Sequence, residues 1–151
     1  MPNVRKANES DSKDIFAWRN DRLTRQVSHT TDLVEWDGHR AWFAASLTNT
    51  KRLLVICEDK DTDEKVAIVR FDVDGERALI SINLSPKMRG KRKAKGCLRD
   101  AISFFQKRFS DVSFIDAEIR PINISSQQSF VGVGFVLVKQ DADVLYYEYA
   151  V

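Results

Sequence analysis

Three runs rich in branched apolar residues follow one another in the middle of the chain, and they constrain its fold most. They cover residues 52–57, 66–71 and 78–84. A polar turn separates the first two runs, and Ser85-Pro86 ends the third. Short β-branched runs bounded by turn residues are typical of strands. The spacing predicts antiparallel strand pairing at the centre of the fold.

Helices and further strands are predicted on both sides of this region. A short strand at 4–7 precedes a helix that Ser10 or Asp11 can cap by accepting hydrogen bonds from its first N–H groups. A second helix follows Glu35, where aromatic and apolar residues recur at three- and four-residue steps. The later elements are a helix at 94–109, a strand at 114–119, a short helix at 125–131 and a closing hairpin of 135–138 with 144–149. One crossover helix among antiparallel strands indicates an α+β architecture.

The length and composition suit a folded single domain. The 151 residues contain no internal repeat or Gly/Ser-rich linker, so we expect one domain over 1–151. With 43% hydrophobic and 30% charged residues, the chain is not collagen-like, disulfide-rich or wholly disordered. It has no apolar stretch of roughly 18 residues and no signal-peptide core, which predicts a cytoplasmic protein without a membrane partner. Cys57 and Cys97 stand apart from any Cys or His cluster, so we expect buried thiols and no metal site.

A basic segment lies between the third central strand and the following helix. It places seven cations within thirteen residues: Lys87, Arg89, Lys91, Arg92, Lys93, Lys95 and Arg99. A helix N-terminus adds N–H groups and a partial positive charge, and Gly90 would let a phosphate approach the backbone. The segment predicts a polyanion site, most naturally for a pyrophosphate. A solvated basic face is one alternative, and a nucleic-acid patch is another. No aromatic residue interleaves with the cations to stack on bases, so we expect no nucleic-acid partner.

Two stretches carry a resemblance to a known family. Residues 82–91, followed by a helix with Leu98, resemble the acetyl-CoA-binding stretch of the GNAT N-acetyltransferase superfamily. Residues 123–126 (Asn-Ile-Ser-Ser), with Phe130 and Gly134-Phe135, are similar to that family's Asn-x-x-Ser helix and terminal Gly-Phe. The resemblance implies an α+β fold with a mixed, mostly antiparallel central sheet flanked by helices. It also implies a splayed cofactor cleft and acetyl-CoA as cosubstrate.

The front of the chain is similar to one branch of this superfamily. The similarity rests on residues 5–7 with Asp11, on 18–21 (Trp-Arg-Asn-Asp), and on the 36–43 pattern Trp-x-x-His-x-x-Trp-Phe. That branch acetylates nucleotide-linked amino sugars in pseudaminic-acid-type pathways, which implies a small-molecule acceptor of that class. Ribosomal-protein N-terminal acetyltransferases share parts of the pattern, so a peptide or protein N-terminus is the alternative acceptor. The oligomeric state stays open, with a homodimer as one option.

Three positions depart from the family's pattern. Arg92 stands where the first loop glycine is expected, and arginine adopts fewer backbone conformations than glycine. Leu79 occupies a place where related enzymes often have a glutamate. Phe130 stands where many members have the tyrosine taken as the general acid. These departures keep a non-catalytic coenzyme A-binding protein as a further alternative.

The resemblance also implies which residues bind the cofactor. Coenzyme A would fill a gap where the strand ending at Leu84 parts from its neighbour near Asn123, and would pair with the backbone as an added strand. A backbone N–H near Asn83 or Leu84 would polarise the thioester carbonyl. The expected cofactor-binding residues come from the strand end, the basic loop and the later helix: Asn83, Leu84, Arg89, Gly90, Lys91, Arg92, Lys93, Ala94, Asn123, Ser126 and Phe130.

Two residues are candidates for proton transfer. Strand alternation puts Ser81 and Asn83 on the face opposite Ile80, and we expect that face to look towards the acceptor. Ser81 could relay a proton to water or thiolate, or it could simply hydrogen-bond locally. His29 suits deprotonation of an amine near neutral pH, or it could be an exposed loop histidine.

The acceptor is expected at the end of the first helix and in the segment after it. The substrate-binding candidates there are Arg19, Asn20, His29 and Thr30. Asn20 is expected to shape the loop, and Arg19 either to pair structurally or to meet a nucleotide phosphate. His39 lies in an apolar helix stripe, so we expect it to be packed. The cations Arg19, Arg22 and Arg25 favour an acceptor that carries a diphosphate.

Overall fold

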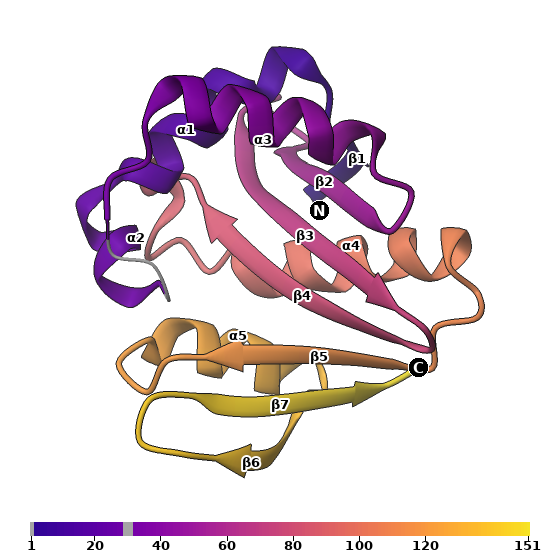
Figure 1. Cartoon of the computed structure of the whole chain (residues 1–151). Coiled ribbons are helices and arrows are strands. Elements are labelled where there is room, and N and C mark those ends of the chain that lie inside the picture. Colours follow the sequence, from indigo (N-terminus) through magenta and orange to yellow (C-terminus); the bar gives the residue numbers. More distant parts are fainter. Residues whose placement is uncertain (1, 29–31) are drawn as a thin grey trace.

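The computed structural model describes residues 2–28 and 32–151. Within these residues a seven-stranded sheet has the order β1-β2-β3-β4-β5-β7-β6 (Figure 1). Its strands are β1 (Pro2–Lys6), β2 (Arg52–Asp59), β3 (Lys65–Asp74), β4 (Arg77–Leu84), β5 (Phe114–Ile119), β6 (Val136–Gln140) and β7 (Leu145–Ala150). The pair β4 and β5 is parallel, and the other described neighbours are antiparallel. The expected α+β class and mostly antiparallel sheet are confirmed.

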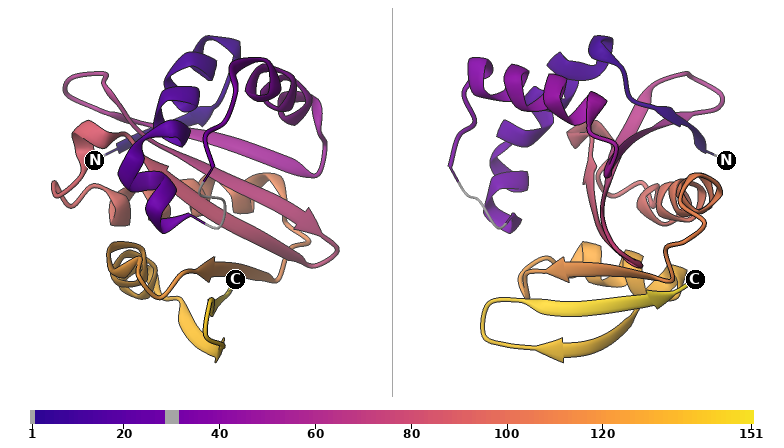
Figure 2. Two further views of the ribbon diagram at one scale, coloured as in Figure 1. Left: turned by 60° about the vertical axis from the view of Figure 1, so that its left-hand side comes forward. Right: turned by 45° about the vertical axis from the view of Figure 1, so that its right-hand side comes forward.

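Helices cover both faces of the sheet. They are α1 (Ser12–Asn20), α2 (Arg22–Val27), α3 (Trp36–Thr48), α4 (Ala94–Arg108) and α5 (Ile124–Val133), with 3-10 turns at Glu9–Asp11 and Pro86–Met88. Figure 2 shows α1, α2 and α3 on one side of strands β2 to β4 and α4 on the other. No helix within the described residues is long and apolar enough to cross a membrane.

Alternating side chains of the central strands build one core on each face. On the α4 side, Phe71 of β3 stacks on Phe105 of α4 with ring centroids 4.2 Å apart. On the other side, Ile56 and Ile68 pack with Phe43 of α3. Because β2 and β3 are buried on both faces, they read in sequence as continuous apolar runs.

The sheet divides between β4 and β5. Their pairing covers only Arg77–Leu79 of β4 and Phe114–Asp116 of β5. Beyond Leu79, β4 stays paired with β3 as far as Leu84, and Figure 1 shows β4 and β5 diverging like the arms of a V. The expected splayed cleft is therefore present.

The start of the first helix differs from the expectation. Asn8 caps the 3-10 turn, because its side-chain oxygen accepts from the N–H of Ser10 at 2.9 Å. Asp11 holds the N-cap position of α1, but its carboxylate makes no cap bond to that helix. It is buried instead, where it pairs with Arg5 and Lys65 at 2.8 Å each. The expected cap by Ser10 or Asp11 was wrong. Arg5, Lys65 and the N–H of Asn8 bind the carboxylate of Asp11, and the hydroxyl of Ser10 donates to the side-chain oxygen of Asn8.

Candidate active site

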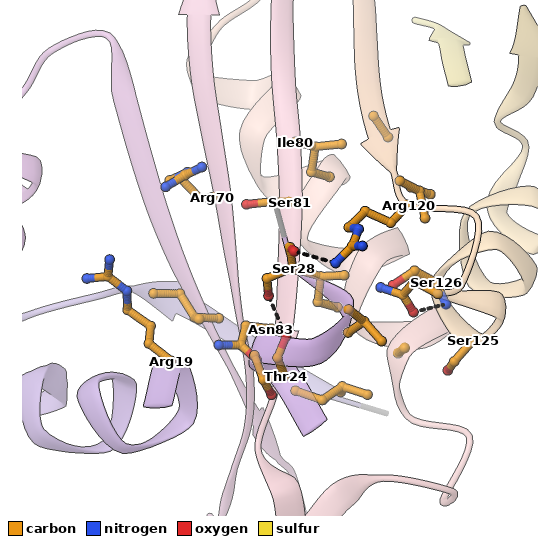
Figure 3. A pocket seen from close by; sticks show the side chains of 18 of the residues that line it. Arg19, Thr24, Ser28, Arg70, Ile80, Ser81, Asn83, Arg120, Ser125 and Ser126 are labelled. Carbon is orange, nitrogen blue, oxygen red and sulfur yellow. Dashed lines mark hydrogen bonds between the residues drawn. The ribbon is translucent and has the colours of Figure 1, made fainter. Parts of the chain in front are cut away.

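A cavity of about 560 Å³ opens where β4 leaves β5 (Figure 3). Ser81 and Asn83 of β4 lie on its wall with Arg19 of α1. Ser28, just beyond α2, and Asn123, before α5, also contribute. The cavity thus brings together three of the sequence regions expected to form a site.

The hydrogen-bond register of β4 decides which of its backbone groups face the gap. The N–H of Ser85 donates to the carbonyl oxygen of Val66 at 2.8 Å, and the pair lies in register with the β3–β4 ladder. In an antiparallel ladder, hydrogen-bonded pairs alternate with pairs whose N–H and C=O groups point outward. Leu84 and Ile82 therefore direct these groups away from β3 and into the gap. Asn83 directs its own towards β3, so Leu84 fits the expected backbone donor and Asn83 does not.

The basic loop before α4 has two residues in the left-handed region. Gly90 has φ 73° and Arg92 has φ 57°. A side chain disfavours this conformation, so the arginine at the expected glycine position is strained. Lys91 and Arg92 are exposed. Lys93, before α4, lies 3.4 Å from the carboxylate of Asp59.

Arg89 bonds to α2, a contact that the sequence did not predict. Its guanidinium pairs with the carboxylate of Asp21 and donates to the hydroxyl of Thr24 at 2.8 Å. The hydrogen bond from Arg89 lowers the pKa of Asp21. The expected phosphate-binding arginine therefore links the basic loop to the helix beside the expected acceptor site.

The far wall of the cavity comes from the start of α5. The side-chain oxygen of Asn123 caps this helix by accepting from the N–H of Ser126 at 3.2 Å. The ring of Phe130 lies on the cavity wall, but it is 2% exposed and meets Phe135 edge to face at 5.0 Å. Phe130 offers no hydroxyl group, so a general acid at this place has to come from another residue or from water.

On the acceptor side, the side chain of Asn20 at the end of α1 is hydrogen-bonded to the backbone of Val34, which lies shortly before α3. Its amide donates to the carbonyl oxygen of Val34 at 2.7 Å and accepts from the N–H of Val34 at 2.6 Å. Ser81 is exposed on the cavity wall, opposite Arg70 in the β3–β4 ladder. His29 and Thr30 lie outside the described residues.

His39 is buried and fixes the position of Arg19. Its Nε2 is 2.9 Å from the carbonyl oxygen of Ser12, which can only accept, so Nε2 carries the proton. Nδ1 of the neutral ring then accepts from Arg19 at 3.0 Å. Burial lowers the pKa of His39, and the charge of Arg19 lowers it further, which keeps the ring neutral. The prediction of a packed His39 is confirmed.

Arginines dominate the charged part of the wall. Among the described lining residues the charged side chains are Arg19, Arg70, Arg89 and Arg120, with Asp32 and Glu118. The described residues contain no group of three His, Cys, Asp or Glu side chains that could hold a metal ion. The cavity therefore suits an anionic ligand better than a cationic one.

Comparisons with known proteins place the chain in a family. Residues 3–136 match the sequence model of the family described as "Acetyltransferase (GNAT) domain". The chain belongs to the GNAT acetyltransferase family. The expected superfamily and enzyme class are thus confirmed, and acetyl-CoA is the acetyl donor that this membership brings. No curated protein sequence matches the chain.

Solved structures of low sequence identity share the GNAT fold. A domain from Methanocaldococcus jannaschii DSM 2661 aligns with a TM-score of 0.80 and 20% identity, over 100% of this chain and 99% of that one. Spermidine N-acetyltransferase from Vibrio cholerae, in complex with CoA and spermine, aligns with 0.85 and 14%, over 99% and 95%. An aminoglycoside acetyltransferase in complex with coenzyme A and kanamycin gives 0.81 and 14%, over 99% and 95%. At these identities the likeness establishes the fold alone.

The sequence analysis did not include two arginines of this GNAT site among the candidate site residues. Arg70 lies within a strand that reads as apolar, and only the register of β3 against β4 brings it opposite Ser81. Arg120 follows β5 and donates to the carbonyl oxygens of Gln26 at 3.0 Å and Ser28 at 3.1 Å, bridging to the end of α2 (Figure 3). A charge interrupting the apolar run 66–71 was the one available signal for Arg70.

Proposed function

We propose that this chain transfers the acetyl group of acetyl-CoA to the amine of a nucleotide-linked amino sugar. The observation that carries the proposal is the gap between β4 and β5, which has a basic loop beside it and arginines on its wall. The basic loop suits the pyrophosphate of the donor. The arginines on the wall suit an acceptor with phosphates of its own.

The residues around the gap fit coenzyme A on two independent grounds. The outward N–H and C=O groups of Ile82 and Leu84 can pair with an extended ligand as an added strand would. The first N–H groups of α4 and the exposed Lys91 and Arg92 can hold a diphosphate. The space next to Gly90 is open, with no atom within 4 Å of the place where a side chain would start. Bound there, acetyl-CoA supplies the activated acetyl group.

Side chains and backbone of β4 would then serve the transfer. An N–H of Ile82 or Leu84 can donate to the carbonyl oxygen, which gains negative charge during attack by the amine. As the C–N bond forms, the C–S bond of the thioester breaks and coenzyme A leaves as a thiolate. The hydroxyl of Ser81 is exposed in the cavity and can relay the proton lost by the amine to this thiolate, directly or through water. Holding the two reactants together supplies much of the rate enhancement.

The acceptor amine has to be neutral to attack. A lysine side chain, with a pKa of about 10.4, would need a strong base. Asp32 and Glu118, the acids among the described lining residues, are both exposed and make poor strong bases. A sugar amine gives up its proton more readily, so water or His29 would suffice.

The charge of the cavity favours this acceptor over polycations and peptides. Spermidine and kanamycin carry several positive charges and would meet the arginines of the wall as like charges. The positive charge of a peptide N-terminus would be disfavoured in the same way. The diphosphate of a nucleotide-linked sugar would be attracted.

An acceptor panel tests the proposal. Release of coenzyme A is measured with nucleotide-linked 4-amino sugars, with peptides that have free N-termini and with spermidine. The matched control is the same amino sugar without its nucleotide. We expect turnover with the nucleotide-linked sugars, and a KM at least about tenfold higher for the free sugar because the phosphate contacts are lost. Turnover confined to peptides or to spermidine would contradict the acceptor while leaving family membership intact.

A further inference from the structure

Two arginines lie over the indole of Trp42, and a third lies close enough to interact with both of their charges. The guanidinium carbons of Arg19 and Arg52 lie 4.5 and 5.8 Å from the ring centroid. Arg70 of β3 is half-buried beside them and lines the cavity. Arg19, Arg52 and Arg70 are called the arginine cluster below.

The cluster shares one carboxylate. Asp72 pairs with Arg52 at 2.5 Å and with Arg70 at 3.3 Å. Among the residues that the structure describes, none forms a carboxylate ion pair with Arg19. Three positive charges therefore face one negative charge.

Arg19 is held in place without being neutralised. One N–H donates to the neutral ring of His39, and the guanidinium lies over Trp42. Both contacts orient the group, and neither carries a negative charge. Burial lowers the pKa of Arg19, and the nearby charge of Arg70 lowers it further, so the cation is destabilised where it lies. A bound anion would relieve that cost.

We propose that Arg19 and Arg70 form a subsite for an anionic group, phosphate or carboxylate, of the acceptor. The inference rests on the proposed acetyl transfer in this cleft and assigns its substrate class as anionic amines. Both arginines line the cavity: Arg70 of β3 lies opposite Ser81 in the β3–β4 ladder, and Arg19 enters from α1, on the side of these strands away from β5 (Figure 3). An anion bound there gains charge-assisted hydrogen bonds from two guanidinium groups.

Anion titrations test the subsite without any acetyl transfer. Inorganic pyrophosphate and glutarate are each titrated calorimetrically, with and without saturating coenzyme A, which competes for the basic loop. The variants are Arg19→Gln and Arg70→Gln, with Arg40→Gln as a control that removes the same charge from an exposed position on α3. Thermal unfolding reports whether each variant folds, and Arg19→Lys provides a milder change that keeps the charge but loses the planar fork.

If the subsite exists, at least one of the two anions should bind, and its binding should depend on both arginines. Arg19→Gln and Arg70→Gln should each weaken that binding about tenfold or more, as expected for a lost charge-assisted hydrogen bond, and Arg40→Gln less than about twofold. Arg19→Lys should fall between wild type and Arg19→Gln. Pyrophosphate alone showing this dependence identifies a phosphate subsite, and glutarate alone identifies a carboxylate subsite. Binding of neither anion, or equal binding by all variants, overturns the proposal.

The subsite and the proposed function fail in different ways. Acetyl transfer to nucleotide-linked sugars that does not change with Arg19 or Arg70 overturns the subsite alone. Arginine-dependent anion binding without transfer to any anionic amine overturns the proposed function alone. Higher salt should weaken anion binding by the wild type more than anion binding by the glutamine variants. Salt screens the arginine charge, and the variants lack that charge.

Discussion

At the scale of single residues, Asp11 shows how tertiary contacts override a local pattern. Its carboxylate accepts from both outer nitrogens of Arg5, at 2.8 and 2.9 Å, and from the N–H of Asn8 at 2.9 Å. Burial alone would raise the pKa of Asp11, but the hydrogen bonds from Arg5 and Lys65 hold it below its usual range. The ionised carboxylate therefore joins β1 and β3 to the start of α1.

Replacing Asp11 should therefore lower stability in a pH-dependent way. We expect Asp11→Asn to reduce the free energy of unfolding by about 2 kcal/mol at pH 7, the range for hydrogen bonds to charged groups. Because the folded-state pKa is depressed, this contribution is present above about pH 4 and is lost as the pH falls towards the folded-state value. Denaturant unfolding of wild type and variant from pH 2 to 7 should show their difference shrinking below about pH 4.

The matched control for Asp11 is Asp14, which also pairs with Lys65 at 2.8 Å but is 55% exposed. Exposed ion pairs contribute little, so Asp14→Asn should change stability by less than about 1 kcal/mol. Equal losses for the two variants, or a difference that does not vary with pH, would refute the role given to Asp11.

Arg92 gives a second prediction at this scale. Its φ of 57° suits glycine, so Arg92→Gly should be more stable than Arg92→Ala by about 1 kcal/mol. Comparing glycine with alanine at one site removes the effect of the lost charge. The same pair at Lys91, which does not have a positive φ, should show the opposite order. Urea denaturation of the four variants tests this. If Arg92→Ala is more stable than Arg92→Gly, the backbone at position 92 is not strained.

At the scale of elements, α2 is held in place by side chains of other elements. None of its residues is buried, and its six residues are too few for a stable helix on their own. Arg89 binds its first turn, through Asp21 and Thr24, and Arg120 binds the carbonyl oxygens at its end. The two arginines connect the acceptor side to the basic loop and to β5.

Removing one of these contacts should loosen α2 locally. We expect Arg120→Ala to speed amide hydrogen exchange at 22–27 by up to about thirtyfold, because two hydrogen bonds of roughly 1 kcal/mol each are lost. Exchange in α4 should stay unchanged, and Arg40→Ala should have no effect on α2. Faster exchange spread over the whole sheet would instead indicate a general loss of stability.

Whether an element buries an apolar face explains which elements the sequence could predict. Strands β2 to β4 and helix α4 were anticipated because their own apolar patterns identify them. Helix α2 was not, because it has no buried face to leave a pattern. Ser81 could be placed by alternation along one strand. The position of Arg70 opposite Ser81 depends on the register between β3 and β4, which the sequence does not show.

At the scale of the whole molecule, the divided sheet makes the site. Strand β4 belongs to the antiparallel part with β3 and meets β5 along three residues only. The outward groups of Ile82 and Leu84 therefore border a cavity where a sheet partner would otherwise lie. The resemblance at 82–91 anticipated this gap, but the sequence could not show which N–H groups enter it. That depends on the hydrogen bond from Ser85 to Val66.

The most direct test is residue-resolved amide exchange by NMR, with and without saturating coenzyme A. If the gap binds the cofactor as an added strand, the N–H groups of Ile82 and Leu84 should become protected. Those of Ser81 and Asn83 already face β3 and should exchange as before. Among these four amides of β4, protection at Ile82 and Leu84 alone is the predicted result. Coenzyme A binding that leaves both amides unchanged would contradict it.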